Sequence, residues 1–335
     1  MITLAQIGSG VWGQNLLRTF SSFPDCRVKI CCDSREEVRA TIRRQYHHQI
    51  QVTDNVQDIL KDPDIDAVIV ATLPASHSLF SIQALEAGKH VFVEKPLALN
   101  LKEGEEMLWA SQKNRKILMV GHLLLYHPAV RKIKSYVEEG ILGDIHYLYS
   151  TRVNLGQIRE EENALWSLTA HDISVAMHLL EQEPLEVAVT GNAYLRENVH
   201  DVVFLTLNFK NNVMCHIHAS WLDPHKVRKF TVVGSKKMVV FDDMESTEKL
   251  RLYDKGVNFQ KDSGTYETFL TLRHGDIHIP KIDMEEPLKL ECRHFIDCVM
   301  NQKEPQSNGA NGLAVLKVLM AAQESLESNG KPIQI

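Results

Sequence analysis

The sequence has no excess of positive charge and no long hydrophobic run. Its 37 Lys and Arg residues are outnumbered by 43 Asp and Glu residues, which gives a formal net charge of −6 at pH 7. Nucleic-acid-binding domains usually carry a basic patch or stripe, so we expect no DNA or RNA partner. No apolar run approaches the roughly 18 residues that a membrane span needs, and residues 1–10 lack a signal-peptide pattern. These absences predict a cytoplasmic protein without a membrane partner.

Cysteine is also sparse, with six residues in 335. They form no CxxC pair and no spacing typical of a metal site. We therefore expect reduced, buried thiols and no bound metal. A chain of this length, with 44% hydrophobic residues, is long enough for two domains with separate cores.

The first 122 residues alternate short apolar runs with helical patterns. Such alternation is typical of a parallel sheet built from βαβ units, and it predicts an α/β Rossmann domain, doubly wound, over residues 1–122. The expected strands are 2–8, 27–32, 50–52, 66–72, 90–94 and 117–122.

The rhythm changes after residue 122. A helix closed by glycine, a strand at 145–154 and a helix at 164–181 precede several alternating strands, with turn signals at 210–212 and 234–237. This pattern predicts an α+β domain over residues 123–335 with an open, mostly antiparallel sheet. Residues 255–285 show weak periodicity and are expected to form a loop, and a last helix is expected at 312–328.

A glycine-rich turn, "GSGVWG", follows the first expected strand and opens a helix. Gly8, Gly10 and Gly13 have the GxGxxG spacing that allows a tight turn, a close approach to a pyrophosphate and close packing of helix on strand. Asp33 ends the second strand, where a carboxylate accepts ribose hydroxyls and repels a 2′-phosphate, so NAD is favoured over NADP. The predicted cofactor-binding residues are Gly8, Gly10, Val11, Trp12, Gly13, Asp33, Ser34, Arg35, Thr72, Leu73, Pro74, His77, Glu94 and Lys95.

The fifth expected strand ends in "EKP", residues 94–96. Ligands of doubly wound sheets bind beyond the carboxyl ends of the strands. Lys95, followed by the rigid Pro96, is therefore expected to point toward the nicotinamide half of the cofactor.

Four segments, "GSGVWG", "ATLPASHSLFSIQALEAGKHVFVEKPLA", "YHPAVRKIKSYVEEGILGDI" and "LWSLTAHDIS", resemble the glucose-fructose oxidoreductase/inositol dehydrogenase (Gfo/Idh/MocA) family. The resemblance implies a Rossmann domain followed by an open-sheet domain, and NAD(P)-dependent oxidation of a sugar hydroxyl. It also implies a homo-oligomer, a tetramer or dimer, assembled through the sheet. By the same resemblance, Lys95 touches both the substrate hydroxyl and the nicotinamide ribose.

The second catalytic residue that the resemblance implies is His171. Many members have aspartates four residues before and three after this histidine, whereas this chain has Ser167 and Ser174. That difference, with "REEENALWSLTAHDIS" and "SWLDPHK", resembles a narrower branch of nucleotide-sugar 3-dehydrogenases. These act on UDP-N-acetylglucosamine or its uronic acid.

Alcohol oxidation passes a hydride to nicotinamide and the hydroxyl proton to a base. A histidine suits a base near neutral pH better than a lysine, so we assign His171 as base and Lys95 as the group that stabilises the alkoxide. An exchange of these roles stays open, as does the identity of the cations that bind the diphosphate. The expected substrate-contacting residues are Tyr126, Arg152, Arg159, Trp166 and Ser167.

The expected reaction is therefore oxidation of the C3 hydroxyl of UDP-N-acetylglucosamine. The 3-keto product suits a separate downstream aminotransferase, as in lipid A or surface-polysaccharide (lipopolysaccharide) biosynthesis. The alternatives are the same oxidation on the C6 uronic acid, oxidation of a free polyol or inositol, and a non-catalytic NAD-binding regulator. Whether NADH is retained and recycled by a 2-oxo acid also stays open.

Overall fold

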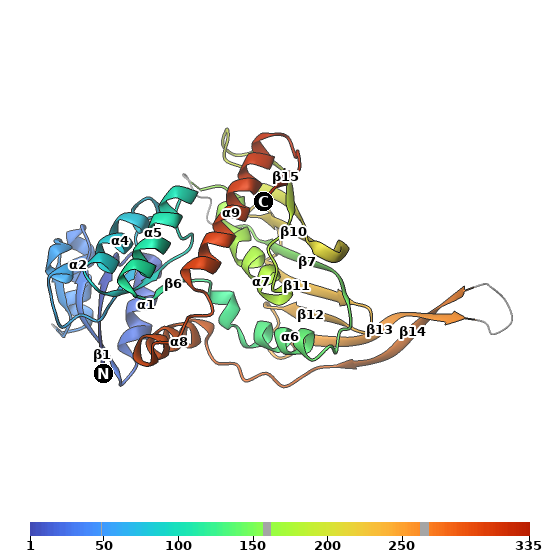
Figure 1. Cartoon of the computed structure of the whole chain (residues 1–335), viewed down its shortest axis with the longest axis horizontal. Coiled ribbons are helices and arrows are strands. Elements are labelled where there is room, and N and C mark those ends of the chain that lie inside the picture. Colours follow the sequence, from blue (N-terminus) through green and yellow to red (C-terminus); the bar gives the residue numbers. More distant parts are fainter. Residues whose placement is uncertain (48, 157–161, 262–267) are drawn as a thin grey trace. The chain divides into compact units, whose positions relative to one another are not determined.

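The computed structural model describes residues 1–335 except 48, 157–161 and 262–267, and of residues 258–261 and 268–269 only the backbone. The described residues divide into two compact units (Figure 1). The first comprises residues 1–126 and 285–317, and the second comprises residues 127–284 and 318–335.

The first unit is built on a parallel sheet of short apolar strands. In the described residues six strands pair in the order β3-β2-β1-β4-β5-β6, which is the order of dinucleotide-binding sheets. Every residue of β4 and β6 is buried, as expected of a sheet covered on both faces. The predicted Rossmann sheet is confirmed. Its strands are β1 (Ile2–Ile7), β2 (Cys26–Cys32), β3 (Gln51–Thr53), β4 (Ala67–Val70), β5 (His90–Val93) and β6 (Leu118–Val120).

The strand order reverses at β1. With right-handed crossovers this reversal places α1 and α2 on one face of the sheet and α4 and α5 on the other. All the carboxyl ends meet at one edge, and the loops after β1 and β4 lie side by side at the reversal point, where ligands of such sheets bind. The helices between the strands are α1 (Val11–Ser21), α2 (Glu36–Gln45), α3 (Gln57–Leu60), α4 (His77–Glu86) and α5 (Leu101–Asn114).

A helix from the C-terminal part of the chain completes this unit. Phe295 of α8 (Pro287–Asn301) meets Phe20 and Phe92 edge-on, with ring centroids 6.2 and 5.7 Å apart. The division of the chain therefore departs from the predicted 1–122 and 123–335, because residues 285–317 pack in the core of the first unit. Helix periodicity shows that a face is buried but not which core buries it.

The second unit is built on an open sheet. Within the described residues nine strands follow the order β14-β13-β12-β11-β7-β10-β9-β8-β15, and β7 and β10 are parallel while the other neighbours are antiparallel. The predicted α+β domain with a mostly antiparallel sheet is confirmed. Its helices are α6 (Pro128–Glu138), α7 (Ala170–Leu180) and α9 (Gly309–Glu327), which begins in the first unit. Its other strands are β7 (Ile145–Val153), β8 (Glu186–Asn192), β9 (Val202–Asn208), β10 (Met214–Ser220), β11 (Val227–Gly234), β12 (Met238–Asp242), β13 (Leu250–Lys261), β14 (Thr268–His278) and β15 (Ile333–Gln334).

The expectation of a loop at 255–285 was wrong for residues 255–261 and 268–278, which form strands, whereas residues 279–285 have no regular secondary structure and residues 262–267 lie outside the described residues. The end of β13 pairs with β14, and this hairpin extends away from the rest of the sheet in Figure 1. Leu270 and Leu272 of β14 are 64% and 74% exposed. Because this part of the hairpin does not pack on a core, its alternation does not separate buried from exposed positions, and the sequence signal is weak.

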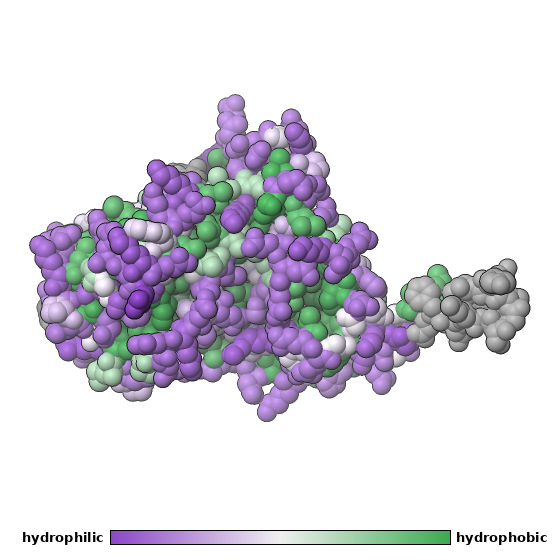
Figure 2. Space-filling view, in the orientation of Figure 1, coloured by the Kyte–Doolittle hydropathy of each residue, from purple (hydrophilic) through white to green (hydrophobic). Residues whose placement is uncertain are grey.

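The six cysteines are free and buried, as predicted. Among the described residues, no helix is both long enough and apolar enough to span a membrane. Figure 2 shows hydrophilic residues over much of the visible surface, with hydrophobic residues in smaller areas between them.

Candidate active site

The glycine turn after β1 is shaped by close contacts that exclude side chains. Gly8 has φ +88°, and a Cβ there would lie 2.6 Å from the Ala71 carbonyl oxygen. A Cβ on Gly13 would lie 2.7 Å from the Gly8 carbonyl oxygen. A Cβ on Gly10 would meet only an Arg35 nitrogen, at 3.9 Å, so the start of α1 is open on this side. The backbone N–H groups at this helix end suit a pyrophosphate.

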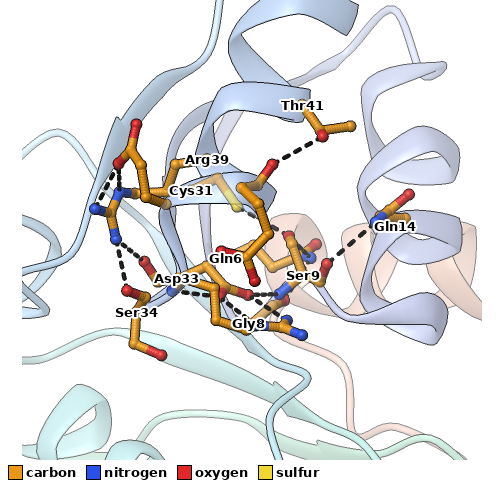
Figure 3. Close-up of polar contacts among 12 residues, drawn as sticks. Gln6, Gly8, Ser9, Gln14, Cys31, Asp33, Ser34, Arg39 and Thr41 are labelled. Carbon is orange, nitrogen blue, oxygen red and sulfur yellow. Dashed lines mark hydrogen bonds and ion pairs between the residues drawn. The ribbon is translucent and has the colours of Figure 1, made fainter.

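The side-chain amide of Gln6 holds the glycine turn through hydrogen bonds. Its Nε2 lies 2.8, 2.9 and 2.8 Å from the Gly8 carbonyl oxygen, Ser9 Oγ and the Gly13 carbonyl oxygen (Figure 3). The residue is fully buried. Sequence reasoning missed Gln6, although a glutamine within an apolar strand is a signal that it hydrogen-bonds inside the fold.

Asp33 lies directly beside this turn. Its Oδ2 accepts from the Ser9 N–H at 2.8 Å, and its two oxygens bind Arg35 Nε and Nη2 at 3.0 and 3.1 Å. The backbone N–H of Arg35 donates to Oδ1 at 3.0 Å. Burial alone would raise the pKa of Asp33, but these donors outweigh it and the pKa lies below its ordinary value. Four donors use the capacity of the carboxylate, so a ribose would take the positions that the Arg35 side chain holds.

Large apolar side chains are exposed at the same edge of the sheet. Val11 is 90%, Trp12 41% and Leu73 74% exposed, and they follow the carboxyl ends of β1 and β4. Exposed apolar residues beside polar donors are typical of a ligand site. The glycine turn, the carboxylate and these side chains together fit a dinucleotide.

His77 connects two loops of this edge. Its Nδ1 lies 2.8 Å from the Pro96 carbonyl oxygen and its Nε2 3.2 Å from the Thr72 carbonyl oxygen, and the ring is buried. Burial lowers the pKa of His77, so the neutral ring is favoured. The neutral ring has one N–H, so it donates to one of these carbonyl oxygens and keeps the loop after β4 close to Pro96. The predicted cofactor contacts of Thr72, Pro74 and His77 stay predictions, as do those of Ser34 and the exposed Leu73.

Glu94, which follows β5, binds Trp12 of α1. The Trp12 Nε1–H donates to Glu94 Oε1 at 2.6 Å, and the Lys95 N–H donates to Oε2 at 3.2 Å. Burial raises the pKa of Glu94 to about 7, although Trp12 and the charge of Lys95 favour the ionised form. Lys95 is thereby positioned next to a carboxyl group that titrates near neutral pH.

Glu291 of α8 is a second buried acid of the first unit. It is 1% exposed, and its Oε1 has no hydrogen-bond partner among the described residues. Burial, and then the charge of Glu94, raise its pKa well above the ordinary value, which favours the protonated form. Sequence reasoning missed this residue because it lies on a helix far from every motif.

The carboxyl end of β6 carries His122. The ring is 2% exposed, and neither nitrogen finds a hydrogen-bond partner in the described part of the chain. Burial, and then the charge of Lys95, lower the pKa of His122 to about 4. A buried ring of this kind at the ligand edge is expected to complete its hydrogen bonds with a ligand.

Tyr126 is buried in the first unit. It is 2% exposed, its hydroxyl lies 2.9 Å from Ser307 Oγ, and its ring contacts His294. Burial raises its pKa strongly. These contacts brace the first unit, and the predicted contact of Tyr126 with the sugar stays a prediction.

In the second unit, His171 lies in the first turn of α7. The π-helical turn η3 (Leu165–Thr169) precedes it, and such turns are frequent at functional sites. Ser174 Oγ donates to the His171 carbonyl oxygen at 2.8 Å, and Ser167 is buried. Trp166 Nε1–H donates to Gln323 Oε1 at 3.0 Å, which fixes the indole to α9. The substrate contacts of Trp166 and Ser167 stay predictions.

The residue after His171 belongs to a buried ion pair. Asp172 accepts from Arg152 Nε at 2.6 Å and Nη2 at 3.2 Å, and from Ser150 Oγ at 2.8 Å. The charge of Asp172 outweighs the effect of burial and raises the pKa of Arg152. Arg152 therefore binds a carboxylate of its own chain. Arg159, the other predicted cation, lies outside the described residues.

Among the described residues, no group of three His, Cys, Asp or Glu side chains could hold a metal ion. Residues 2–122 match the model of the oxidoreductase family with an NAD-binding Rossmann fold, and residues 130–240 match the GFO/IDH/MocA C-terminal domain.

Relatives with known names match over most of the chain. Identity is 28% to myo-inositol 2-dehydrogenase of Thermotoga maritima, over 87% of both chains. It is 28% to the uncharacterized oxidoreductase YrbE of Bacillus subtilis, over 98% of this chain and 95% of the relative. UDP-N-acetylglucosamine 3-dehydrogenase of Acidithiobacillus ferrooxidans is 22% identical, over 79% of this chain and 80% of its own.

Solved structures of similar fold cover the chain from end to end. That of the same Acidithiobacillus enzyme has a TM-score of 0.83 at 19% identity, over 98% of both chains. GenD2 from gentamicin A biosynthesis, in complex with NAD, has a TM-score of 0.83 at 19% identity, over 100% of this chain and 96% of its own. With both domain models matched and the cofactor edge built as described, the chain belongs to the GFO/IDH/MocA family of oxidoreductases and its first unit is an NAD-binding Rossmann domain.

Proposed function

We propose that the protein is an NAD-dependent nucleotide-sugar dehydrogenase that oxidises the C3 hydroxyl of UDP-N-acetylglucosamine to a 3-keto sugar. The observation that carries the proposal is the surroundings of His171, where Ser167 and Ser174 stand in place of the two acids of many family members. The Acidithiobacillus relative, named for this reaction, supports it.

The chemistry of the proposal divides between two residues. NAD, when bound, supplies the hydride acceptor. His171 takes the proton of the C3 hydroxyl, and the Lys95 ammonium stabilises the negative charge that develops on that oxygen. The C3–H bond breaks as the C3=O double bond forms. The glycine turn and Asp33 hold the cofactor while these residues act.

Two substrates compete with this one. The C6 uronic acid of the same sugar differs by one carboxylate, and a free polyol is favoured by the higher identity to myo-inositol 2-dehydrogenase. A non-catalytic NAD-binding regulator is the alternative from another class. A regulator transfers no proton, so it would not need to keep both Lys95 and His171.

The proposal includes assembly into a dimer or tetramer through the second sheet. Tyr147, Tyr149, Phe204 and Met214 are 40–42% exposed, and the strand register places all four on one face. Tyr147 and Tyr149 stack on each other. An exposed aromatic face of this kind is typical of a subunit interface. A cytoplasmic location and an aminotransferase that uses the ketone complete the proposal.

The test is turnover with a panel of substrates. Purified protein is incubated with NAD and, separately, UDP-N-acetylglucosamine, its uronic acid, free N-acetylglucosamine and myo-inositol, with and without a 2-oxo acid to reoxidise retained NADH. We expect reduced nicotinamide and a 3-keto product, by mass, from UDP-N-acetylglucosamine. A product from the uronate or the polyol alone would reassign the substrate, and no product from any of them would favour the regulator.

A further inference from the structure

Two arginines of the second unit face each other across neighbouring strands. Arg152 of β7 and Arg228 of β11 are direct cross-strand partners, so their side chains leave the same face of the sheet. That face is the one against α7, because Arg152 binds Asp172 there. Burial, and then the charge of Arg152, lower the pKa of Arg228. Like charges directly opposite each other destabilise a sheet, and this pair is therefore a local cost of the fold.

The two arginines differ in their carboxylate partners. The side chain of Arg152 is 11% exposed and binds both oxygens of Asp172, which is 2% exposed. The side chain of Arg228 is 40% exposed, and its ion pair with Asp243 Oδ2 is 4.0 Å long. That distance is beyond a hydrogen bond. Arg152 is neutralised within the fold, while the Arg228 guanidinium keeps donors that face solvent.

Asp243 is itself shared among several cations. Its Oδ1 lies 3.6 Å from His127 Nε2 and 3.5 Å from Lys249 Nζ. The contact with His127, followed by the charges of Lys249 and Arg228, lowers the pKa of Asp243 to about 2 against the opposing effect of burial. Within this described cluster, Arg152, Arg228 and Lys249 face the two carboxylates Asp172 and Asp243. The charges of these five side chains sum to one positive charge.

We propose that Arg228 binds an oxyanion of the substrate, a phosphate or a carboxylate. The inference rests on the proposed function and assigns a residue that recognises the anionic group of its substrate. The planar guanidinium binds either group through two parallel hydrogen bonds. Asp172 neutralises Arg152 and directly follows His171, so α7 carries the proposed base and fixes the neighbouring arginine. Of the two arginines, Arg152 is neutralised by Asp172, and Arg228 is left for an anionic group of the substrate.

The test compares matched ligands on matched variants of the NAD-loaded enzyme. UDP against uridine measures the phosphate, and N-acetylglucosaminuronic acid against N-acetylglucosamine measures the carboxylate, each by titration calorimetry. The variants are Arg228→Gln and Lys229→Gln. Lys229 is the next residue of β11, points to the opposite face and is exposed, so its replacement removes the same charge.

We expect Arg228→Gln to weaken binding of one anionic ligand by about 10- to 100-fold, the usual effect of losing hydrogen bonds to a charged group. The neutral partner of that ligand and the Lys229→Gln variant should stay near the wild-type values. Equal losses in the two variants, or an anionic ligand that binds no better than its neutral partner, would overturn the inference. If Arg228→Gln melts below the wild type, Arg228→Lys repeats the comparison with the charge kept, and partial recovery of anion binding is expected.

The titration, combined with the turnover assay, distinguishes a failure of this inference from a failure of the proposed function. If anion binding depends on Arg228 but UDP-N-acetylglucosamine is not turned over, the proposed C3 oxidation is wrong and the anion site is supported. If Arg228→Gln turns over UDP-N-acetylglucosamine with an unchanged KM, the proposed anion site is wrong and the C3 oxidation is supported.

Discussion

The cofactor edge of the first unit and the α7 face of the second differ in the span of chain that builds them. Gln6, Gly8 and Gly13 make contacts within one short segment, and Asp33, which follows the last glycine at a fixed spacing, joins them through the Ser9 N–H. On the α7 face, Arg152 meets Asp172 twenty residues on, and its cross-strand partner is Arg228. The first site is encoded as a motif, and the second arises from the topology of the sheet.

The largest expected effect is on catalysis, from a substitution that leaves the motif-encoded cofactor site intact. His171→Ala should lower kcat by about 10²- to 10⁴-fold, the usual contribution of a general base, without changing the Kd of NAD. Steady-state turnover and cofactor titration measure the two quantities. Lys95→Ala is the companion variant. If Lys95→Ala rather than His171→Ala removes the pH dependence of kcat/KM, the lysine is the base and the two roles are exchanged.

The next effect tests the topology-encoded site through stability. Asp172→Ala leaves the buried Arg152 guanidinium without its carboxylate, which should lower the free energy of unfolding by about 3–5 kcal/mol. Denaturant unfolding measures the loss. The double variant Asp172→Ala/Arg152→Met also removes the unpaired buried charge, so it should regain most of the lost stability. A double variant as unstable as the single one would contradict this account of the pair.

A smaller effect tests Glu94, the acid next to Lys95, and the buried Glu291. The folded pKa of Glu94 is about 7 against 4.5 for the ordinary group, so the folded state keeps a proton that the unfolded state releases earlier. The wild type should therefore lose stability relative to Glu94→Gln as pH rises from 4.5 to 7, by up to about 3 kcal/mol. Unfolding at pH 5 and pH 8 gives the difference. Glu291→Gln mimics the protonated form that burial favours in Glu291, so it should leave the stability at pH 7 close to wild type.

The smallest effect concerns the motif-encoded site. Asp33→Asn removes a charged acceptor and should weaken NAD binding by about tenfold, since a hydrogen bond to a charged group is replaced by one to a neutral group. It should also narrow the preference for NAD over NADP, because the negative charge no longer repels a 2′-phosphate. Fluorescence titration with both cofactors measures these changes. An unchanged ratio of the two Kd values would mean that Asp33 does not face the ribose.

The two sites also differ in how much the sequence could predict. The glycines and Asp33 follow strands at fixed spacing, and the strand order that brings them to one edge is confirmed. The role of Gln6 in that turn, and the buried Glu291 near Glu94, depend on packing that no spacing reveals. Arg228 could not be told from other cations because the difference is the geometry of its carboxylate partner.

Helix α8 and the β13–β14 hairpin show the same limit at the level of the fold. The apolar face of α8 is a local property, but its packing on Phe20 and Phe92 is not. The hairpin is held by pairing between its own strands, with little burial to impose a pattern on residues 255–257 and 270–278. Local periodicity therefore predicts elements well where a core covers them and poorly where none does.

The most direct test of the central claim is the fate of the hydrogen on C3. UDP-N-acetylglucosamine deuterated at C3 is incubated with the enzyme and NAD, and the reduced nicotinamide is weighed by mass spectrometry. The account predicts one deuterium in the nicotinamide, and none when the label is placed at C4 instead. Reduced nicotinamide without deuterium from the C3-labelled sugar would contradict oxidation at C3.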